Sequence, residues 1–214
     1  VQRGVVMEEF KQRCLNRPYG DTGHLLCPLV YKEHPYQWPT IGKELNHIAQ
    51  ATLQEVEDFF FSFYAPNNAI LAVTGNITFE EAVRLAEKWF GPIPRRELKK
   101  RNLPAEPQQT EERRLTVERN VPIESLYMAF RMCDRMHPDY YAYDILSDIL
   151  SNGRSSRLIQ HLVHDRQIFS SIDAHISGSI DAGLFHITGK PANGVSLEDA
   201  EKAVWEELQI ISNE

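Results

Sequence analysis

Residues 52–76 read TLQEVEDFFFSFYAPNNAILAVTGN and carry three structural signals in immediate succession. Thr52 and Glu55 form a capping-box pattern, in which a hydroxyl and a carboxylate satisfy backbone amides at the start of a helix. Apolar residues continue to Phe63, and the Pro-Asn-Asn sequence that follows is typical of a turn. Residues 69–74 (AILAVT) are short, apolar and followed by Gly-Asn, so they predict a strand that is buried on both faces.

Helical patterns flank this stretch on both sides. Thr78 and Glu81 form a second capping-box pattern, which predicts a helix that ends at the Gly-Pro-Ile-Pro sequence of residues 91–94. Upstream, residues 3–14 place apolar side chains four positions apart, as one face of a helix does. Residues 18–42 are rich in proline, tyrosine and histidine without a period, and we expect an irregular loop that is functional or packed against another part of the molecule.

The second part of the chain predicts a sheet with helices. Residues 94–112 (PRRELKKRNLPAEPQQTEE) have prolines and charges but no apolar period, which is typical of a linker between domains. After them we expect strands at residues 114–118, 125–131, 170–177 and 184–189, and helices at residues 138–151, at residues 156–165 and after Ser196. These patterns predict an α+β fold, with a mostly antiparallel sheet and helices packed on one of its faces.

Composition excludes several classes of protein. The 214 residues are 42% hydrophobic and 25% charged, which is typical of a globular protein. A net charge of −7 gives no electrostatic support for binding nucleic acid, and the basic residues among residues 95–101 are expected to lie in the solvated linker. The three cysteines lie far apart, as free thiols do. No apolar run approaches the roughly 20 residues that a membrane-spanning helix needs.

Four segments, taken together, resemble one known family. They are residues 3–9 (RGVVMEE), 34–42 (HPYQWPTIG), 63–76 and 139–158. Each is common by itself, but their order and spacing over nearly the whole chain resemble the pitrilysin/insulinase family of zinc metallopeptidases. This family is also called the inverzincins, and its shorter bacterial and mitochondrial-processing-type members are the most similar.

The resemblance implies a fold of the LuxS/processing-peptidase type. Such proteins have two related α+β halves, which enclose a chamber together with a partner pair of halves. Residues 1–93 would then be the C-terminal part of the first, zinc-bearing half. Residues 94–112 would be the linker, and residues 113–214 part of the second, non-catalytic half.

The family's zinc site comes from a His-x-x-Glu-His helix and a glutamate on a later helix. Two histidines four residues apart share one helix face and can bind one ion, while the intervening glutamate activates a water molecule. By resemblance, the later ligand corresponds to Glu9. The His-x-x-Glu-His motif is absent from the sequence, and no two of its eight histidines lie four residues apart. In this chain by itself Glu9 is expected to be a solvated helix residue.

We therefore expect zinc only in an intact parent protein and none in this chain, which would be inactive alone. The sequence does not begin with methionine, and we expect it to be part of a longer protein. Many members of the family also have an arginine and a tyrosine that help to bind substrate and to stabilise the oxyanion. Counting from residues 156–158, these places fall at Val163 and Ser170, neither of which can do that work.

Two functions stay open at this point. The first is a fragment of a zinc-dependent metalloendopeptidase that forms scaffold and substrate-chamber wall and acts on peptides within the intact enzyme. The alternative is a non-enzymatic assembly or partner subunit with an inactive peptidase fold. The expected partners are the missing portions of the parent chain or a homologous subunit. No compartment follows from the sequence, and both cytoplasm and periplasm remain open.

Two smaller groups of residues have competing interpretations. His161, His164 and Asp165 lie within one predicted helix and could bind a metal, but an ordinary amphipathic helix surface explains them equally well. His24 and His34 of the irregular loop could face a chamber, whereas packing is the favoured interpretation for the loop's Tyr31, Tyr36 and Trp38.

Overall fold

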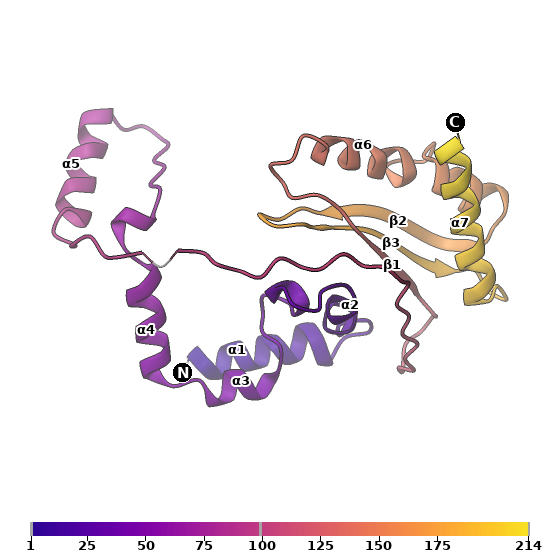
Figure 1. The fold of residues 1–214 in the computed structure, drawn as a ribbon, viewed down its shortest axis with the longest axis horizontal. Coiled ribbons are helices and arrows are strands. Elements are labelled where there is room, and N and C mark those ends of the chain that lie inside the picture. Colours follow the sequence, from indigo (N-terminus) through magenta and orange to yellow (C-terminus); the bar gives the residue numbers. More distant parts are fainter. Residues whose placement is uncertain (1, 99, 214) are drawn as a thin grey trace.

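The computed structural model describes residues 2–98 and 100–213. Figure 1 shows three parts in chain order: a helical N-terminal part, a projecting pair of helices, and a three-stranded sheet with its own helices. Residues 100–125 contain no helix or strand and run extended toward the sheet. None of the helices in the described residues is long and apolar enough to cross a membrane.

The helical N-terminal part contains α1 (Gln2–Phe10), α2 (Thr22–Val30) and α3 (Leu45–Gln50). A π-helical turn, Lys11–Leu15, extends α1, so the helix predicted at residues 3–14 is confirmed. The expectation of an irregular loop throughout residues 18–42 is wrong, because α2 and a short 3₁₀ turn (Pro35–Gln37) lie within it. Pro28 suggested a break, but it lies near the end of α2, where it removes only one hydrogen bond of the helix.

The projecting part contains α4 (Leu53–Phe63), a 3₁₀ turn (Pro66–Asn68) and α5 (Phe79–Phe90). The predicted capping box is confirmed, since the Thr52 side chain accepts the amide of Glu55 while the Glu55 carboxylate accepts the amide of Thr52. At α5 only one half of the box forms. Thr78 caps the helix, but Glu81 pairs with Arg84 instead of reaching back.

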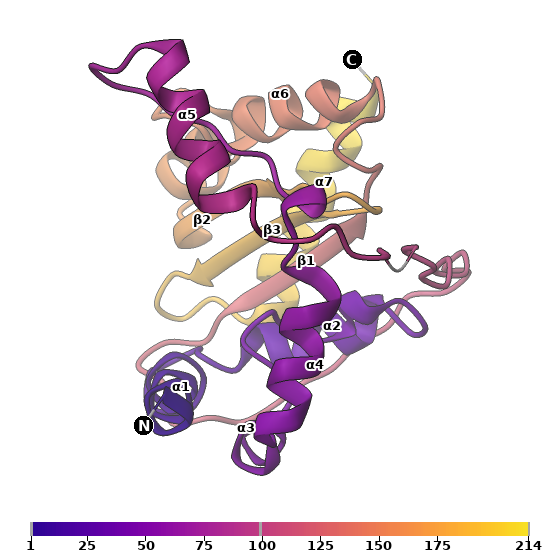
Figure 2. The same cartoon turned by 90° about the vertical axis from the view of Figure 1, so that its left-hand side faces the viewer.

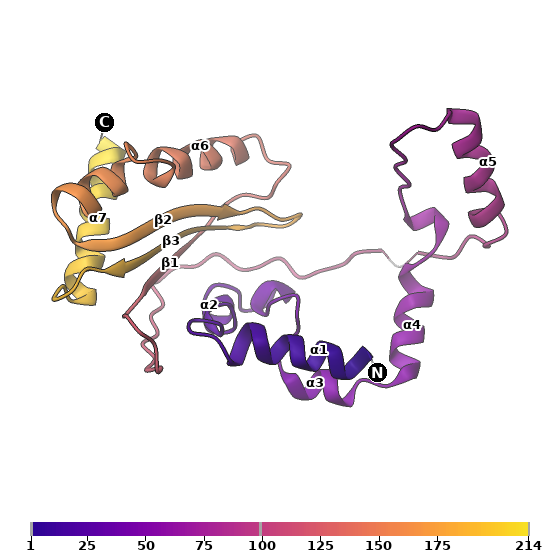
Figure 3. The ribbon, with the colours of Figure 1, turned by 180° about the vertical axis from the view of Figure 1, so that it is seen from behind.

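Residues 69–74 form no strand, which corrects the prediction of a strand buried on both faces. Ile70 is 99% exposed, and no backbone of the described residues runs alongside to pair with the segment. A strand needs hydrogen-bonding neighbours, and apolar sequence alone does not provide them. Figures 1 and 3 show this segment and α5 standing away from the sheet.

The sheet has the order β1-β3-β2 and is antiparallel throughout. Its strands confirm three of the four predicted ones, whereas residues 114–118 stay extended without a partner. The strands are β1 (Leu126–Arg131), β2 (Phe169–Ser177) and β3 (Leu184–Pro191). The predicted helices are confirmed as α6 (Tyr140–Ser151), a π-helix (Ile159–Asp165) and α7 (Leu197–Asn213), whose first turn Ser196 caps.

One face of the sheet forms the main core. Ile187 of β3 lies between Met128 and Ala174 in register, and the helices cover this row with fully buried leucine and valine side chains. These are Leu150, Leu158, Leu162 and Val204. The predicted α+β fold, an antiparallel sheet with helices on one face, is therefore confirmed, and Figure 2 shows the helices beside the sheet.

The other face of the sheet is polar, and the end of α2 covers one end of it. Val30 and Tyr31 pack against Leu184, with Ala129 beside them. This small second cluster is where the helical N-terminal part meets the sheet, on the side opposite to α6 (Figure 3).

Candidate functional site

Glu9, the predicted zinc ligand of an intact parent, lies on the last turn of α1. One of its carboxylate oxygens is 2.9 Å from the guanidinium of Arg13, and Glu8 binds Lys11 at 2.6 Å. Both glutamates border a shallow hollow beside Val5 and Gln12. The carboxylate of Glu9 is thus partly exposed and paired with one cation.

These surroundings do not make a zinc site. Across residues 2–98 and 100–213, no three His, Cys, Asp or Glu side chains lie close enough together to hold a metal ion. Zinc takes four ligands and usually three from the protein at catalytic sites. Glu9 supplies one, and among the described residues it belongs to no group of three candidate ligands.

The two positions of the family's arginine and tyrosine have other roles here. Val163 lies in the π-helix and packs against the main core. Ser170 lies at a bulge, where the register of β2 against β3 shifts between Phe169 and Ser171. The bulge leaves Ser170 exposed, and its hydroxyl donates to the carbonyl of Lys190 at 3.1 Å.

The metal site that His161, His164 and Asp165 could form does not assemble. His161 turns to α7, where its Nδ1 lies 2.8 Å from the carboxylate of the buried Glu207. Asp165 instead accepts a hydrogen bond from Gln160 at 2.9 Å. Sequence reasoning missed Glu207 because it lies in a different helix, 46 residues after its partner.

A pair of histidines occupies the polar face of the sheet. His175 and His186 are cross-strand neighbours whose rings stack 4.9 Å apart, and Asp173 binds His175 at 2.7 Å. Ser177 lies 2.9 Å from the Nε2 of His186. Burial first, and then His175, lowers the pKa of His186 to about 4, so this ring is neutral at pH 7.

The aromatic residues of the predicted loop act as packing anchors, as favoured. Tyr31 is buried, and its hydroxyl donates to the carbonyl of Ala182 at 2.9 Å. Tyr36 packs edge-on against Tyr31, and its hydroxyl lies 2.5 Å from that of Ser179. Trp38 stays more exposed at the surface. These contacts join the helical N-terminal part to the turn between β2 and β3.

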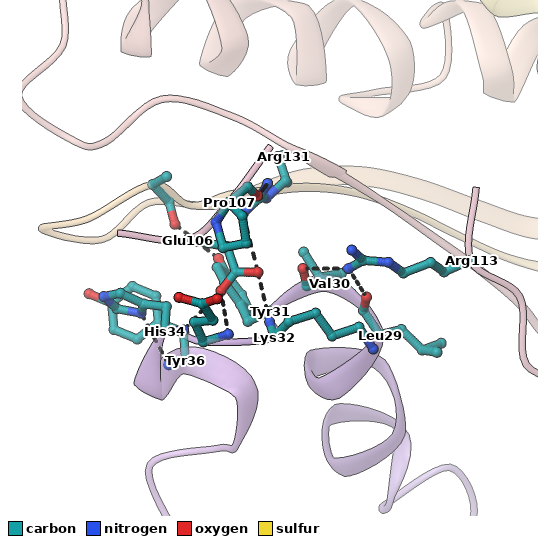
Figure 4. A network of polar contacts seen from close by, with 12 residues as sticks. Leu29, Val30, Tyr31, Lys32, His34, Tyr36, Glu106, Pro107, Arg113 and Arg131 are labelled. Carbon is teal, nitrogen blue, oxygen red and sulfur yellow. Dashed lines mark hydrogen bonds and ion pairs between the residues drawn. The ribbon is translucent and has the colours of Figure 1, made fainter. Parts of the chain in front are cut away.

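Glu106 is the polar residue that sequence reasoning missed most clearly. It lies within the predicted linker, yet its carboxylate accepts hydrogen bonds from the backbone amides of Lys32, Glu33 and His34 (Figure 4). Figure 4 also shows Arg113, which donates to the last carbonyls of α2. Nothing in a proline- and charge-rich segment marks one glutamate as a capping group for a turn some 70 residues upstream.

The projecting part carries the largest set of exposed apolar side chains. We call it the α4–α5 surface and define it by exposed residues of both helices and of the segment between them. They are Leu53, Val56, Phe59, Phe60, Phe61, Phe63, Tyr64, Ile70, Leu71, Val73, Ile77, Phe79, Val83, Trp89 and Phe90. Apolar side chains at this density on an exposed surface are typical of an interface.

Comparisons with known proteins agree on one family. Residues 50–214 match the Peptidase M16 inactive domain. The chain is 28% identical over 208 residues to the zinc protease PqqE of Helicobacter pylori, across 95% of this chain and 46% of that protein. It is 26% identical to the uncharacterized zinc protease YmxG of Bacillus subtilis, across 88% of this chain and 44% of the relative.

Superposition on solved structures agrees with these sequence matches. A crystal structure of a protease from Helicobacter pylori superposes with a TM-score of 0.84 at 28% identity, covering 97% of this chain and 51% of that one. This chain thus spans about half the length of the relatives that it matches. The match covers more than half of this chain, so the protein belongs to the M16 family of peptidases and carries its inactive domain.

Proposed function

We propose that this chain forms scaffold and chamber wall in a zinc metallopeptidase whose His-x-x-Glu-His motif lies in another stretch of polypeptide. The observation that carries the proposal is the unpaired α4–α5 surface. In this proposal residues 1–93 are the C-terminal part of the zinc-bearing half, residues 94–112 a linker, and residues 113–214 part of the non-catalytic half.

The α4–α5 surface favours a partner that brings β-strands. Residues 69–74 have the composition of a buried strand, yet their backbone has no neighbour and Ile70 is 99% exposed. Unpaired backbone groups and apolar side chains are both satisfied when a strand pairs alongside. The helices on either side, with Leu53 73% and Phe79 78% exposed, would then cover the completed sheet.

The half-length match supports the identity of this partner. The relatives have about as much chain again as this protein covers, and two of them are named zinc proteases. In the assembled protein Glu9 would add one carboxylate to ligands from the partner. The zinc would supply Lewis acidity there, whereas this chain would position Glu9 and wall the chamber. Substrates would be peptides.

A reconstitution tests the proposal. The purified chain is mixed with an M16 polypeptide from the same organism that carries His-x-x-Glu-His, and chelator-sensitive cleavage of a quenched peptide is measured. We expect no cleavage by the chain alone and cleavage by the complex. A complex without cleavage supports the alternative, a non-enzymatic assembly subunit, and the absence of any complex contradicts both.

Matched variants show whether the proposed surface is used. Ile70→Asp places a charge in the α4–α5 surface and should abolish the complex. Met136→Asp changes an equally exposed residue outside this surface, 84% exposed, and should leave the complex intact. Equal effects of the two substitutions would contradict the assignment.

A further inference from the structure

A buried polar joint connects the helical N-terminal part to the sheet, and it is built around His34. Three segments meet there: the turn after α2, residues 101–107, and the turn between β2 and β3. The contacts are separated by 72 to 147 positions in sequence. The joint therefore sets how the helical part and the sheet lie relative to one another (Figure 4).

Glu106 holds the turn after α2 in place. Its side chain is 6% exposed, and its oxygens accept the amides of Lys32 at 2.7 Å, Glu33 at 2.9 Å and His34 at 2.8 Å. Arg131 of β1 lies 3.6 Å from the same carboxylate. Three charge-assisted hydrogen bonds to one buried carboxylate therefore fix the backbone of this turn.

His34 makes the connection to the sheet, and its contacts define which ring nitrogen carries the proton. The side chain is 5% exposed. Its Nδ1 lies 3.2 Å from the backbone nitrogen of Tyr36, which can only donate, so Nδ1 must accept. The proton of the neutral ring is then on Nε2 and is donated to a carboxylate oxygen of Asp181 at 3.2 Å. Both nitrogens are satisfied only while the ring is neutral.

Protonation of the His34 ring would disfavour these contacts for more than one reason. A proton on Nδ1 would face the amide proton of Tyr36, because both nitrogens would then be donors. Asp181 would attract a charged ring, but Arg101 already pairs with that carboxylate and adds positive charge. Glu106 is saturated by amides and faces the backbone of His34 rather than its ring.

Two uncharged aromatic side chains also lie against the ring. Tyr36 lies edge-on to it at 4.3 Å, and Tyr31 lies 6.1 Å away. Burial first, and then the charge of Arg101, lowers the pKa of His34 below its ordinary value of 6.5. Because the unfolded chain binds this proton more readily, the stabilising contribution is complete above about pH 6.5 and is lost as the pH falls.

We infer that His34 is a pH-dependent latch between the helical N-terminal part and the turn of the β2–β3 hairpin. While the ring is neutral the latch is closed, and protonation of the ring shifts it toward the open form. Opening releases Tyr36 and Asp181 from the ring, but Glu106 keeps the turn after α2 folded. The helical part would then move relative to the sheet without unfolding of the main core.

Hydrogen exchange of the whole chain tests the latch. Exchange is measured at pH 7.5 and pH 5.5, corrected for the intrinsic pH dependence, in peptides that cover residues 30–38 and 177–184. We expect protection to fall by up to roughly tenfold at pH 5.5, because the opened ring has the ordinary pKa of 6.5 and binds a proton tenfold more readily for each pH unit below it. Protection in β3 beyond Leu184 should fall only through His186, and by the same factor in the unmodified chain and in His34→Gln.

Two substitutions complete the test. His34→Gln can accept from Tyr36 and donate to Asp181 at either pH, so residues 30–38 of this variant should lose the pH dependence that comes from His34. His47→Gln removes an exposed histidine of α3 and should behave as the unmodified chain. Equal protection of residues 30–38 in the unmodified chain at both pH values, or a pH dependence of these residues that is as large in His34→Gln, overturns the latch.

The tautomer gives a second measurement that needs no variant. Ring ¹⁵N chemical shifts of His34 at pH 7.5 should show a protonated Nε2 and an unprotonated Nδ1. If His34→Gln does not fold, this measurement still decides the matter. A ring protonated at Nδ1, or a charged ring at pH 7.5, overturns the latch.

Discussion

The sheet with its helices and the projecting α4–α5 part contain equally clear sequence patterns but reach different degrees of burial. In the sheet, Leu162 and Val204 are completely buried, whereas in the projecting part Leu53 and Phe79 are largely exposed. Both parts form capped helices. The difference lies in pairing: β3 has a neighbour on each side, and residues 69–74 have none. Local sequence is enough to form helices, but burial requires a partner in space.

The same substitution in the two parts should have the most different effects. Leu162→Ala removes a fully buried side chain and should lower the free energy of unfolding by about 2–5 kcal/mol. Leu53→Ala changes an exposed side chain and should alter it by less than about 0.5 kcal/mol. Urea unfolding followed by the fluorescence of Trp205, which packs edge-on against Phe130, measures both. A similar loss of unfolding free energy in both variants would mean that α4 is packed in the isolated chain.

Substitutions of two glycines allow the same comparison of the two parts, with smaller expected effects. A Cβ at Gly189 would lie 2.4 Å from the ring of Phe169, which is buried, so Gly189→Ala should cost about 1–3 kcal/mol. Gly75 has a φ of +142° but open space around it, and the strain of Gly75→Ala should stay local to the unpaired segment. The urea midpoint of the sheet should move for the first variant alone. A shift of that midpoint in Gly75→Ala would contradict the separation of the two parts.

Acid should destabilise the sheet through His186. Its pKa is about 4 in the folded chain and 6.5 ordinarily, so stability is unaffected above about pH 6.5 and falls as the pH drops toward 4. With allowance for partial exposure, the loss should be about 1–2 kcal/mol. Unfolding of His186→Gln between pH 7 and pH 4 should lack this component, and the exposed His47→Gln serves as the control. A variant that retains the full loss would assign the pH dependence to other groups.

Substitutions of helix-capping residues should give the smallest difference between the two parts. Ser196→Ala removes the cap of α7, which packs on the main core, and should lower the free energy of unfolding by about 1 kcal/mol. Thr52→Ala removes the cap of α4, and because α4 is not packed, only its helical content should decrease. Circular dichroism and urea unfolding separate these outcomes. A lower unfolding midpoint for Thr52→Ala would show that α4 unfolds together with the sheet.

Features that depend only on residues close together in the sequence were predictable. The capping box of Thr52 and Glu55 is complete within four positions, and the alternation of β2 and β3 follows from their own residues. The strand predicted at residues 69–74 failed because strand formation also depends on a partner that the sequence of one segment does not specify. Glu81 shows the same limit on a smaller scale, since Arg84 competes for its carboxylate.

The polar joint was beyond sequence reasoning for a related reason. His34 was a candidate only as a residue of an irregular loop, because its partner Asp181 lies 147 positions later. Glu106 lies in a segment whose composition is typical of a linker, and nothing in that composition distinguishes this glutamate from the others. Glu9, Val163 and Ser170 were located by family resemblance, and their roles in an assembled enzyme remain predictions.

The most direct test of the central claim is amide hydrogen exchange of residues 69–74, measured in the isolated chain and after addition of the zinc-bearing M16 polypeptide. The account predicts exchange near the intrinsic rate in the isolated chain and protection of roughly 100-fold or more in the complex, as paired strands show. Strong protection in the isolated chain, or unchanged exchange in a complex that has formed, would contradict the claim that a partner completes this surface.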